Sequence, residues 1–320
     1  MEKKPQITIA GAGSIGCFVG GLLLASGHHV SFLGREHVAN ELAASGLTLS
    51  DYTSMKTVIG PEQIAVKADP ACLCHADVIL VCVKGGATRT MGALIAEHAK
   101  PEAVVVSLQN GIRNAEILAT ILPDNDVRAG MVPFNVIKPA PGTFHRATSG
   151  DMVVEAGTPD VAGLLDVAHL KTGASHEMKA ILRGKMLLNL NNALNAISDM
   201  PLLDQLNQRS WRVRMAQQID EALAVFKAEG ITPIPPSPVP AWVLPHILRL
   251  PTPLFKRVAK RMLEIDPTAR ASMWEDLRQG RKTEINDLQG EIVRLAEQFG
   301  LPSPHNRQTL EEIRAIEQQG

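Results

Sequence analysis

Short apolar runs predict the strands in the first half of the chain. Gln6–Ala10 and His29–Leu33 are rich in β-branched or aromatic residues and predict strands, and the apolar stretch Cys17–Ser26 between them predicts a helix. Three further runs predict strands, and the first two are continuously apolar, as parallel strands buried on both faces should be. These runs are Val78–Val83, Ala103–Leu108 and Val127–Val132.

Helical spacing separates these strands, at Thr90–Ala99 and Asn114–Leu122. After the turn cluster Pro139–Gly142, two short strands are expected around Phe144 and Val153. Alternating strands and helices predict a Rossmann-type α/β domain with a mostly parallel, doubly wound sheet, in which ligands bind at the carboxyl ends of the strands. We assign it to residues 1–175.

The second half of the chain has a helical pattern and predicts an all-α domain over residues 176–320. The expected helices are Lys185–Ile197, Trp211–Glu229, Phe255–Leu263, Met273–Phe299 and Asn306–Gln318. Eight prolines between Thr232 and Pro253 predict an extended loop with at most one turn around Trp242–Leu250. An α/β domain followed by a helical one predicts a substrate cleft between them.

A dinucleotide-binding motif joins the first predicted strand to the first helix. It has the sequence G-x-G-x-x-G and consists of Gly11, Ala12, Gly13, Ser14, Ile15 and Gly16. Gly11 permits the tight turn, Gly13 lets the pyrophosphate approach the backbone, and Gly16 lets helix and strand pack closely. The helix N-terminus offers N–H groups to the phosphates. The alternative is a secretory signal, but the glycines and serines interrupt the apolar run that a signal needs.

The end of the second strand favours NADP(H) as the cofactor. Arg35 follows Gly34 there, and an arginine at this place pairs with the 2′-phosphate of NADP. Glu36 is the competing residue, because an acid could bind the ribose of NAD. We expect Glu36 instead to open the next helix, where an acidic side chain in the first turn is favourable.

Length and charge exclude several classes of protein. The chain has 320 residues, 32 basic and 33 acidic, so its formal net charge of −1 gives no general attraction to nucleic acid or to an anionic membrane. No apolar run is long enough to span a membrane. Four cysteines make no disulfide framework, so we expect a reduced, cytoplasmic protein. Cys72, Cys74 and His75 fit no standard zinc pattern, and no metal is expected.

Polar residues with chemical potential occur in both halves of the chain. Lys84 and Gln109-Asn110-Gly111 follow predicted parallel strands. On the helix from Lys185, positions 185, 189 and 192 share one face, which places an ammonium beside the carboxamides of Asn189 and Asn192. Asparagine is unfavourable inside helices, which suggests a task for some of these residues; the alternative is a solvated helix face.

A charged segment from Ser272 to Glu284 completes the set of candidates. It reads as an amphipathic helix with a break at Gly280, after which Thr283 caps a second helix with Glu284 in its first position. The helix dipole would hold the Glu284 carboxylate ionised. Taken alone, the segment is better explained as a solvated surface.

Together these residues resemble the ketopantoate reductases (2-dehydropantoate 2-reductases), NADP-dependent enzymes with a Rossmann domain and a helical C-terminal domain. The resemblance spans essentially the whole chain. The residues that carry it are Gly11–Gly16, Val83-Lys84, Gln109-Asn110-Gly111, Lys185, Asn189, Ser272-Met273, Asp276 and Lys282-Thr283-Glu284. Two positions depart from the family pattern: Ala193 stands where a second helix asparagine is frequent, which Asn192 could replace, and Arg183 stands where a tryptophan is frequent.

The resemblance implies a role for each candidate residue. Lys185 is the catalytic general acid, and Glu284 is the active-site glutamate, which orients Lys185 or the substrate hydroxyl. The substrate is bound by Asn110, Asn189, Asn192 and Ser272. The cofactor is contacted by the glycine motif, Arg35, Lys84, Asn110 and Glu284.

The sequence therefore predicts an NADPH-dependent reductase of a small 2-oxo acid, with ketopantoate to pantoate as the leading reaction, in a monomer or homodimer. The hydride goes to C2, and Lys185, with its pKa lowered by desolvation, donates the proton. A related NADP-dependent dehydrogenase of another hydroxy acid shares this logic. A non-catalytic NADPH-binding sensor is the alternative from a different class.

Overall fold

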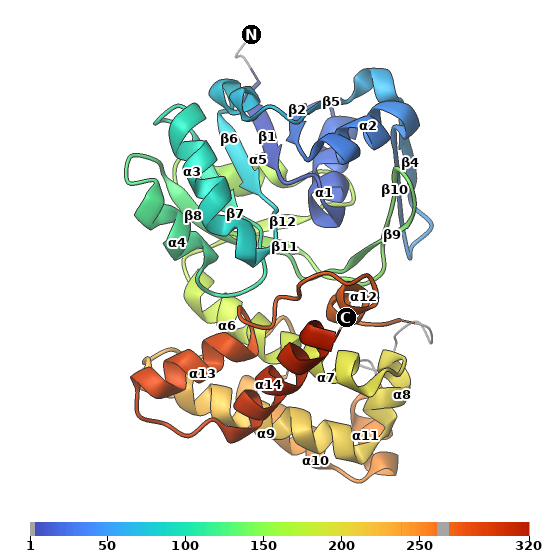
Figure 1. Ribbon diagram of the computed structural model, residues 1–320, viewed down its shortest axis with the longest axis vertical. Coiled ribbons are helices and arrows are strands. Elements are labelled where there is room, and N and C mark those ends of the chain that lie inside the picture. Colours follow the sequence, from blue (N-terminus) through green and yellow to red (C-terminus); the bar gives the residue numbers. More distant parts are fainter. Residues whose placement is uncertain (1–3, 238, 261–268, 320) are drawn as a thin grey trace. The chain divides into compact units, whose positions relative to one another are not determined.

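The computed structural model describes residues 4–237, 239–260 and 269–319 and is shown in Figure 1. The chain divides into two compact units, residues 1–178 and 179–320. The first unit combines sheets and helices, whereas the described part of the second is helical.

The first unit contains an eight-stranded sheet. In spatial order its strands are β12 (Thr172–Ser175), β11 (Met152–Glu155), β8 (Val127–Met131), β7 (Val104–Ser107), β6 (Val78–Val81), β1 (Gln6–Ala10), β2 (His29–Leu33) and β5 (Ala65–Lys67). All neighbours pair in parallel except β8 and β11. Because β1 lies between β2 and β6, the strand order reverses beside the glycine motif, as in a doubly wound fold. The predicted fold class is confirmed.

Helices cover both faces of this sheet (Figure 1). They are α1 (Ser14–Ala25), α2 (Glu36–Ser45), α3 (Thr88–His98), α4 (Asn114–Ile121) and the short α5 (Val161–Leu165). Alternate residues of a central strand enter different cores: Ile7 and Ile9 pack in one buried cluster, and Ala10 packs in the other with Ile79 and Val81. Burial on both faces explains why these strands are continuously apolar.

A second, four-stranded sheet packs against α1, and local sequence patterns predict only one of its strands. Its order is β4 (Lys56–Ile59), β3 (Leu47–Asp51), β10 (Thr143–Arg146) and β9 (Val136–Ala140). Only the strand around Phe144 was expected. Leu47, Leu49 and Phe144 are buried in the same cluster as α1, whereas β4 alternates with exposed residues and carries little apolar signal. Packing against α1 therefore stabilises these short strands more than the intrinsic β-propensity of their residues does.

The helices of the second unit pack around α9. The described elements are α6 (Met178–Asn189), α7 (Asn191–Ser198), α8 (Leu202–Asn207), α9 (Arg209–Ala228), α10 (Leu244–Arg249), α11 (Thr252–Val258), α12 (Ser272–Arg278), α13 (Gln289–Gln298) and α14 (Pro304–Gln319). Helix α9 contacts α7, α8, α10, α13 and α14. A 3₁₀ turn, Ala241–Val243, precedes α10.

The single helix predicted over Lys185–Ile197 is two helices, α6 and α7, which break at Leu190. The Leu190 carbonyl accepts a hydrogen bond from the Gln289 side chain at 2.8 Å. A side chain that draws a carbonyl out of the helical ladder is a known cause of such breaks. Asn192 consequently belongs to a different helix from Lys185 and Asn189, and the prediction of one continuous stripe was wrong.

The helix predicted over Met273–Phe299 is also divided. Gly280, with a φ of +61°, ends α12, and the Arg281 N–H returns to the Asp276 carbonyl at 2.8 Å. Helix α13 begins only at Gln289, so Thr283 caps no helix and Glu284 lies in a turn. The Thr283 N–H donates instead to Glu317 of α14 at 2.7 Å. The Thr283 hydroxyl accepts the Ile285 N–H at 3.2 Å, so it closes a local turn rather than capping a helix.

The proline-rich segment contains more helix than expected, because Arg212 holds it. The buried Arg212 guanidinium donates to the carbonyls of Leu206, Leu248 and Leu250 at 2.8–3.1 Å. It thus satisfies carbonyls at the ends of α8 and α10. The helix predicted over Phe255–Leu263 corresponds to α11 in part, and residues 261–263 lie outside the described residues.

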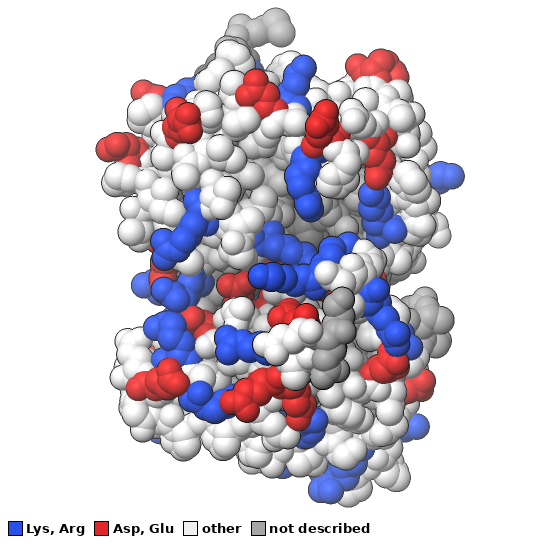
Figure 2. All heavy atoms as spheres, in the orientation of Figure 1, with Lys and Arg blue, Asp and Glu red and all other residues white. Residues whose placement is uncertain are grey.

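Charged side chains of both signs are spread over the visible face of each unit (Figure 2), in line with the near-balanced composition. Among the described residues, no helix is both long and apolar enough to cross a membrane. The same part of the chain contains no group of three or more His, Cys, Asp or Glu side chains placed to hold a metal ion.

Candidate active site

The turn between β1 and α1 has the geometry of a phosphate-binding loop. Gly11 has a φ of +117°, which L side chains rarely adopt. The N–H groups of Gly11 and Ala12 both donate to the Leu33 carbonyl, at 3.0 and 3.1 Å, which ties the turn to the end of β2. A Cβ on Gly16 would lie 2.2 Å from the Gly11 carbonyl oxygen, so only glycine fits there. Both glycines are thus required by the backbone itself.

Gly13 differs, because nothing in the protein occupies the space beside it. No heavy atom lies within 4 Å of a Cβ placed on Gly13. Gly13 is the N-cap of α1, and no side chain caps that helix and no acidic residue stands in its first turn. Ser14, Ile15 and Gly16 form this first turn. Helix α1 therefore begins at Ser14, three residues before the predicted start at Cys17. An uncapped helix N-terminus facing open space fits the pyrophosphate of a dinucleotide.

Arg35 lies beside this loop at the carboxyl end of β2. It is exposed and forms the N-cap of α2, while Glu36 occupies the first turn of α2, as expected from the sequence. The preceding Gly34 lies so close to the loop that a Cβ there would be 2.9 Å from the Ala12 Cβ. The exposed Arg35 therefore directly follows the residue that packs against the glycine turn.

Lys84 and Asn110 follow the neighbouring strands β6 and β7. They lie at the carboxyl ends of the parallel strands, as the glycine turn after β1 does. Lys84 is exposed and Asn110 is half-buried. A buried network that the sequence analysis missed holds the Asn110 backbone: the Thr88 hydroxyl donates to Asn114 Oδ1 at 2.8 Å, and Asn114 Nδ2 donates to the Asn110 carbonyl at 2.5 Å. Gln109 Nε2 joins it by donating to Thr88 at 2.7 Å. Thr88 and Asn114 begin α3 and α4, 26 positions apart, so a bond between them leaves no local sequence signal.

Lys185 and Glu284 interact electrostatically within the second unit. Desolvation by burial lowers the pKa of Lys185 to about 8, and the negative charge of Glu284 opposes that shift. Both residues are half-buried. They come from α6 and from the turn before α13, 99 positions apart, so the fold brings together two residues that local sequence patterns do not connect.

Two contacts fix the helix that carries Lys185. Arg183 is buried and forms a two-pronged ion pair with Glu229, at 2.8 and 2.7 Å, and Arg183 also donates to the Lys179 carbonyl. A Cβ on Gly184 would lie 2.0 Å from the Ile234 carbonyl oxygen, so α6 packs directly against the backbone of the proline-rich segment. A paired arginine thus stands where the resembling family has a tryptophan, and it serves packing of α6.

Ser272 is the first residue of α12, and Asn195 of α7 holds the start of that helix. Asn195 is fully buried, and its Oδ1 accepts the N–H of Ala271 at 2.9 Å. Its Nδ2 donates to the Met200 carbonyl and to Gln205 Oε1, at 3.0 and 3.1 Å. The sequence analysis did not assign Asn195 a role; the unfavourable asparagines of this stretch were the available signal.

The structure thus gathers the expected residues in two groups. In the first unit, the glycine turn, Arg35, Lys84 and Asn110 all lie at the carboxyl ends of parallel strands. In the second unit, Lys185 interacts with Glu284, Asn189 lies one helical turn after Lys185, and Ser272 and Asn192 lie on the packed helices α12 and α7. Asn189, Asn192 and Ser272 are each half-buried.

Known proteins match both units. The family model described as Ketopantoate reductase PanE/ApbA matches residues 7–159, and the model of the C-terminal domain of that family matches residues 177–317. A 2-dehydropantoate 2-reductase of Halobacterium salinarum is 24% identical over 98% of this chain and 100% of its own length.

Solved structures extend this comparison. The crystal structure of a PanE/ApbA family ketopantoate reductase from Ralstonia eutropha is 28% identical, covers 98% of this chain and 99% of its own, and superposes with a TM-score of 0.84. A D-mandelate dehydrogenase in a ternary structure with NADH and anilino(oxo)acetate has a TM-score of 0.80 at 21% identity, over 98% of this chain and 99% of its own, which shows the shared fold. With family models matching most of its length, the chain belongs to the ketopantoate reductase family of oxidoreductases.

Proposed function

We propose that this protein reduces 2-dehydropantoate (ketopantoate) to pantoate, with NADPH as the reductant. The observation that carries the proposal is Lys185, a half-buried lysine with a pKa of about 8 beside the Glu284 carboxylate. A carbonyl reduction needs a proton donor that is still protonated at neutral pH and yet acidic enough to give up its proton. Lys185 meets both conditions.

Bound NADPH would supply the hydride, and negative charge would then develop on the C2 oxygen of the substrate. The Lys185 ammonium would stabilise that charge and donate its proton to the oxygen. An unperturbed lysine has a pKa of about 10.4 and is a poor acid at neutral pH. Desolvation makes Lys185 a stronger acid, while the Glu284 carboxylate keeps the ammonium form populated before the reaction.

Other residues would bind and orient the substrate. Asn189 lies four positions after Lys185 on α6 and therefore on the same face of the helix. Together with Asn192 and Ser272, it would donate hydrogen bonds to the carboxylate or hydroxyl groups. Glu284 would orient Lys185 or the substrate hydroxyl, and Asn110 would contact both cofactor and substrate.

The cofactor would bind across the carboxyl ends of the parallel strands of the first unit. The pyrophosphate would lie over Gly13, where a Cβ finds no neighbour within 4 Å, and against the uncapped N-terminus of α1. Lys84 and Glu284 are further candidates for contacts with the cofactor. Arg35 would pair with the 2′-phosphate, and this contact is the reason for proposing NADP(H) over NAD(H).

A second candidate reaction is the reduction of a different 2-oxo acid. The fold is shared with a D-mandelate dehydrogenase, and this chain has Ala193 and Arg183 at two positions where the family pattern differs. Because the lysine and the glycine turn are unchanged, the reaction type would be kept while the 2-oxo acid differs.

A panel of substrates tests the proposal and separates the two candidates. The purified protein is incubated with NADPH and with ketopantoate, 2-oxoisovalerate or pyruvate, and the loss of NADPH absorbance is followed. We expect the highest kcat/KM with ketopantoate. A higher value for another 2-oxo acid would replace ketopantoate as the substrate, and the absence of turnover with all three would refute the proposed function.

A further inference from the structure

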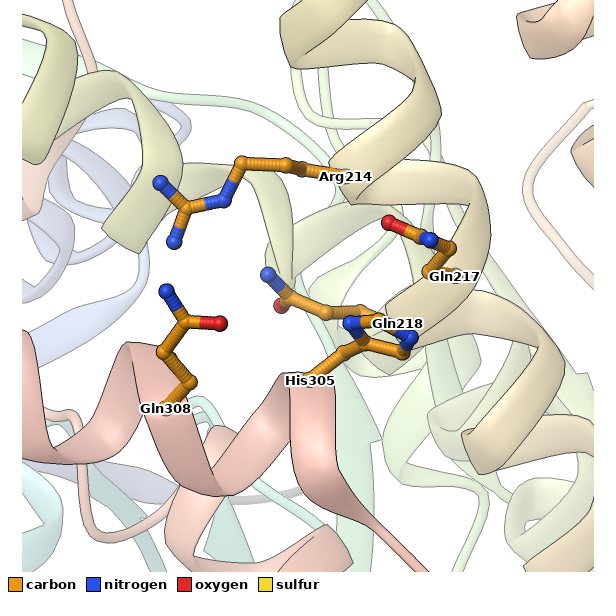
Figure 3. Close-up of a pocket in the computed structure, with 5 residues that line it drawn as sticks. All are labelled: Arg214, Gln217, Gln218, His305 and Gln308. Carbon is orange, nitrogen blue, oxygen red and sulfur yellow. The ribbon is translucent and has the colours of Figure 1, made fainter.

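A polar cavity of about 220 Å³ lies within the second unit, between α9 and α14. Its lining residues come from these two helices only: Arg214, Gln217, Gln218, His305 and Gln308. Figure 3 shows the side chains from α9 reaching toward those from α14, with Arg214 and Gln308 facing each other. None of these residues belongs to the candidate active site.

Helical geometry explains why the side chains converge. Positions 214, 217 and 218 share one face of α9, and positions 305 and 308 share one face of α14. Gln218 is almost fully buried, and its Nε2 donates to the Thr309 hydroxyl at 3.0 Å. Arg214 Nη2 donates to Glu312 at 2.8 Å, and Gln308 Nε2 donates to the same carboxylate at 2.8 Å. The cavity wall is therefore ordered by hydrogen bonds between the two helices.

The surplus of hydrogen-bond donors in this cavity comes from the Arg214 guanidinium. In the described part of the chain, Arg214 uses only Nη2, so that Nε and Nη1 have no protein acceptor. The Gln217 amide and the His305 ring likewise have no protein partner there, and only the Oε1 atoms of Gln217 and Gln308 remain as amide acceptors. Arginine offers five N–H donors in a planar fork, glutamine two and histidine one or two. A surplus of donors around a guanidinium suits a carboxylate.

The carboxylates of Glu221 and Glu312 lie nearby, but they do not accept hydrogen bonds from the remaining Arg214 donors. Both oxygens of Glu221 accept N–H groups of the first turn of α14, from His305 at 2.8 Å and Asn306 at 2.9 Å. Glu312 engages Arg214 through Nη2 and leaves the Nε and Nη1 donors of the guanidinium unused. The glutamine amides provide both donors and acceptors next to this charged fork, which fits a hydroxyl or an amide.

We propose that this cavity is a binding site for a small carboxylic acid that also carries an amide or hydroxyl group, and that its occupation tunes the catalytic helix. The carboxylate would pair with Arg214, and the amide or hydroxyl would bind Gln217 and Gln308.

A short chain of hydrogen bonds connects the cavity wall to the helix of Lys185. Gln218 Oε1 accepts Gln289 Nε2 at 2.9 Å, and Gln289 Nε2 also donates to the Leu190 carbonyl at 2.8 Å. Leu190 is the break between α6, which carries Lys185 and Asn189, and α7. A ligand that moves Gln218 therefore acts on the residue where the catalytic helix ends. This part of the inference rests on the proposed function, whereas binding in the cavity does not.

Tryptophan fluorescence provides a binding test that needs no substrate, because the Arg214 guanidinium lies 5.3 Å from the Trp211 ring centroid. N-acetylglycine, which has one carboxylate and one amide, is titrated against acetamide and inorganic phosphate. We expect a saturable change with N-acetylglycine, weakened about tenfold or more in Arg214→Gln, because a charge-assisted hydrogen bond contributes about 1.5–3 kcal/mol. Arg307→Gln is the matched control, since Arg307 is on α14 but pairs with Glu297 at 2.8 Å.

Three results would overturn the site: no saturable change, equal binding by Arg214→Gln and the wild type, or equal binding of acetamide, which lacks a carboxylate. Tighter binding of phosphate would overturn the ligand class. The folded state of Arg214→Gln is checked by its thermal unfolding.

The activity test uses the same probe at saturating NADPH and ketopantoate. We expect N-acetylglycine to change kcat in the wild type and in Arg307→Gln but not in Arg214→Gln. Competition at the active site would instead persist in Arg214→Gln and would refute the regulatory role.

Gln289→Met should retain binding but lose the change in kcat, and an unchanged response would overturn the route through Leu190. Absence of turnover without the probe would count against the proposed function, while the fluorescence titration would still decide the site.

Discussion

The two units build their parts of the site in different ways. In the first unit the decisive groups are backbone atoms: the turn at Gly11, the open space at Gly13 and the N–H groups at the start of α1. In the second unit they are side chains, Lys185 and Glu284, from distant parts of the sequence. A backbone site depends on which residues lack a Cβ, whereas a side-chain site depends on how several helices pack.

Electrostatics differ in the same way. In the proposed site, the first unit would attract negative charge with backbone N–H groups at a helix end, which cannot titrate. The second relies on a lysine with a pKa lowered to about 8 by burial. The nucleotide part of the site should therefore be insensitive to pH around neutrality, and the chemical step should not. The following experiments separate the two units by this criterion.

The largest effect is expected for Lys185→Ala. If Lys185 donates the proton, kcat should fall by about 10²–10⁴-fold, while the affinity for NADPH alone should barely change. Steady-state kinetics and a fluorescence titration of NADPH measure both. Lys179→Ala is the matched control, because Lys179 is an exposed lysine on the same helix. A rise in KM at constant kcat would assign Lys185 to substrate binding, and normal turnover would refute the mechanism.

Gly13→Val tests the first unit by filling the open space beside the glycine turn. The added side chain meets no protein atom at Cβ, so the protein should fold, but the pyrophosphate would be displaced. We expect affinity for NADPH to fall by at least about 100-fold, the cost of losing about two charge-assisted hydrogen bonds. Gly173→Val is the control, since a Cβ there also meets no neighbour and the position is on β12. Unaltered NADPH affinity in folded Gly13→Val would remove the site.

Arg35→Ala should have a smaller and more selective effect. Loss of one charge-assisted contact to the 2′-phosphate predicts a roughly 10- to 100-fold rise in the KM for NADPH, with little change for NADH. NADH is the internal control, because it lacks that phosphate. An equal loss for both cofactors would show that Arg35 is structural and would remove the main support for NADP(H).

The pH dependence of the reaction follows from Lys185. Only its protonated form can donate, so kcat/KM for reduction should be constant below about pH 8 and fall about tenfold per pH unit above it. Oxidation of the product requires the neutral amine and should fall on the acidic side. Because Glu284 raises the pKa of Lys185, Glu284→Gln should move the break to lower pH. A break that stays in place would separate Glu284 from the lysine.

The smallest effect concerns stability. The pKa of Lys185 is about 8 in the folded protein against an ordinary value of 10.5, so its charged form opposes folding below pH 8 and this penalty disappears as the pH rises from 8 toward 10.5. Lys185→Met should therefore raise the melting temperature at pH 7 by a few degrees, roughly 2–4 °C per kcal/mol, and by less at pH 10. Equal gains at both pH values would indicate better packing instead.

The sequence by itself determined the first unit well, because its signals are local. The apolar residues of β1, β2, β6 and β7 reflect burial on both faces, and the glycine spacing reflects a turn that admits no other residue. The short strands β3, β4 and β9 escaped prediction because packing against α1, rather than their own composition, stabilises them.

In the second unit, only the tertiary structure decided where the helices end and which side chains meet. Helical periodicity located its helices, but the Leu190 carbonyl, where α6 ends, accepts a hydrogen bond from Gln289 about 100 positions away, and the Thr283 hydroxyl, expected to cap a helix, accepts the Ile285 N–H in a turn. The pairing of Lys185 with Glu284 and the hold of Asn195 on Ala271 likewise join distant segments. A hydrogen bond between side chains of different helices leaves no period in the sequence, so only the packed fold reveals it.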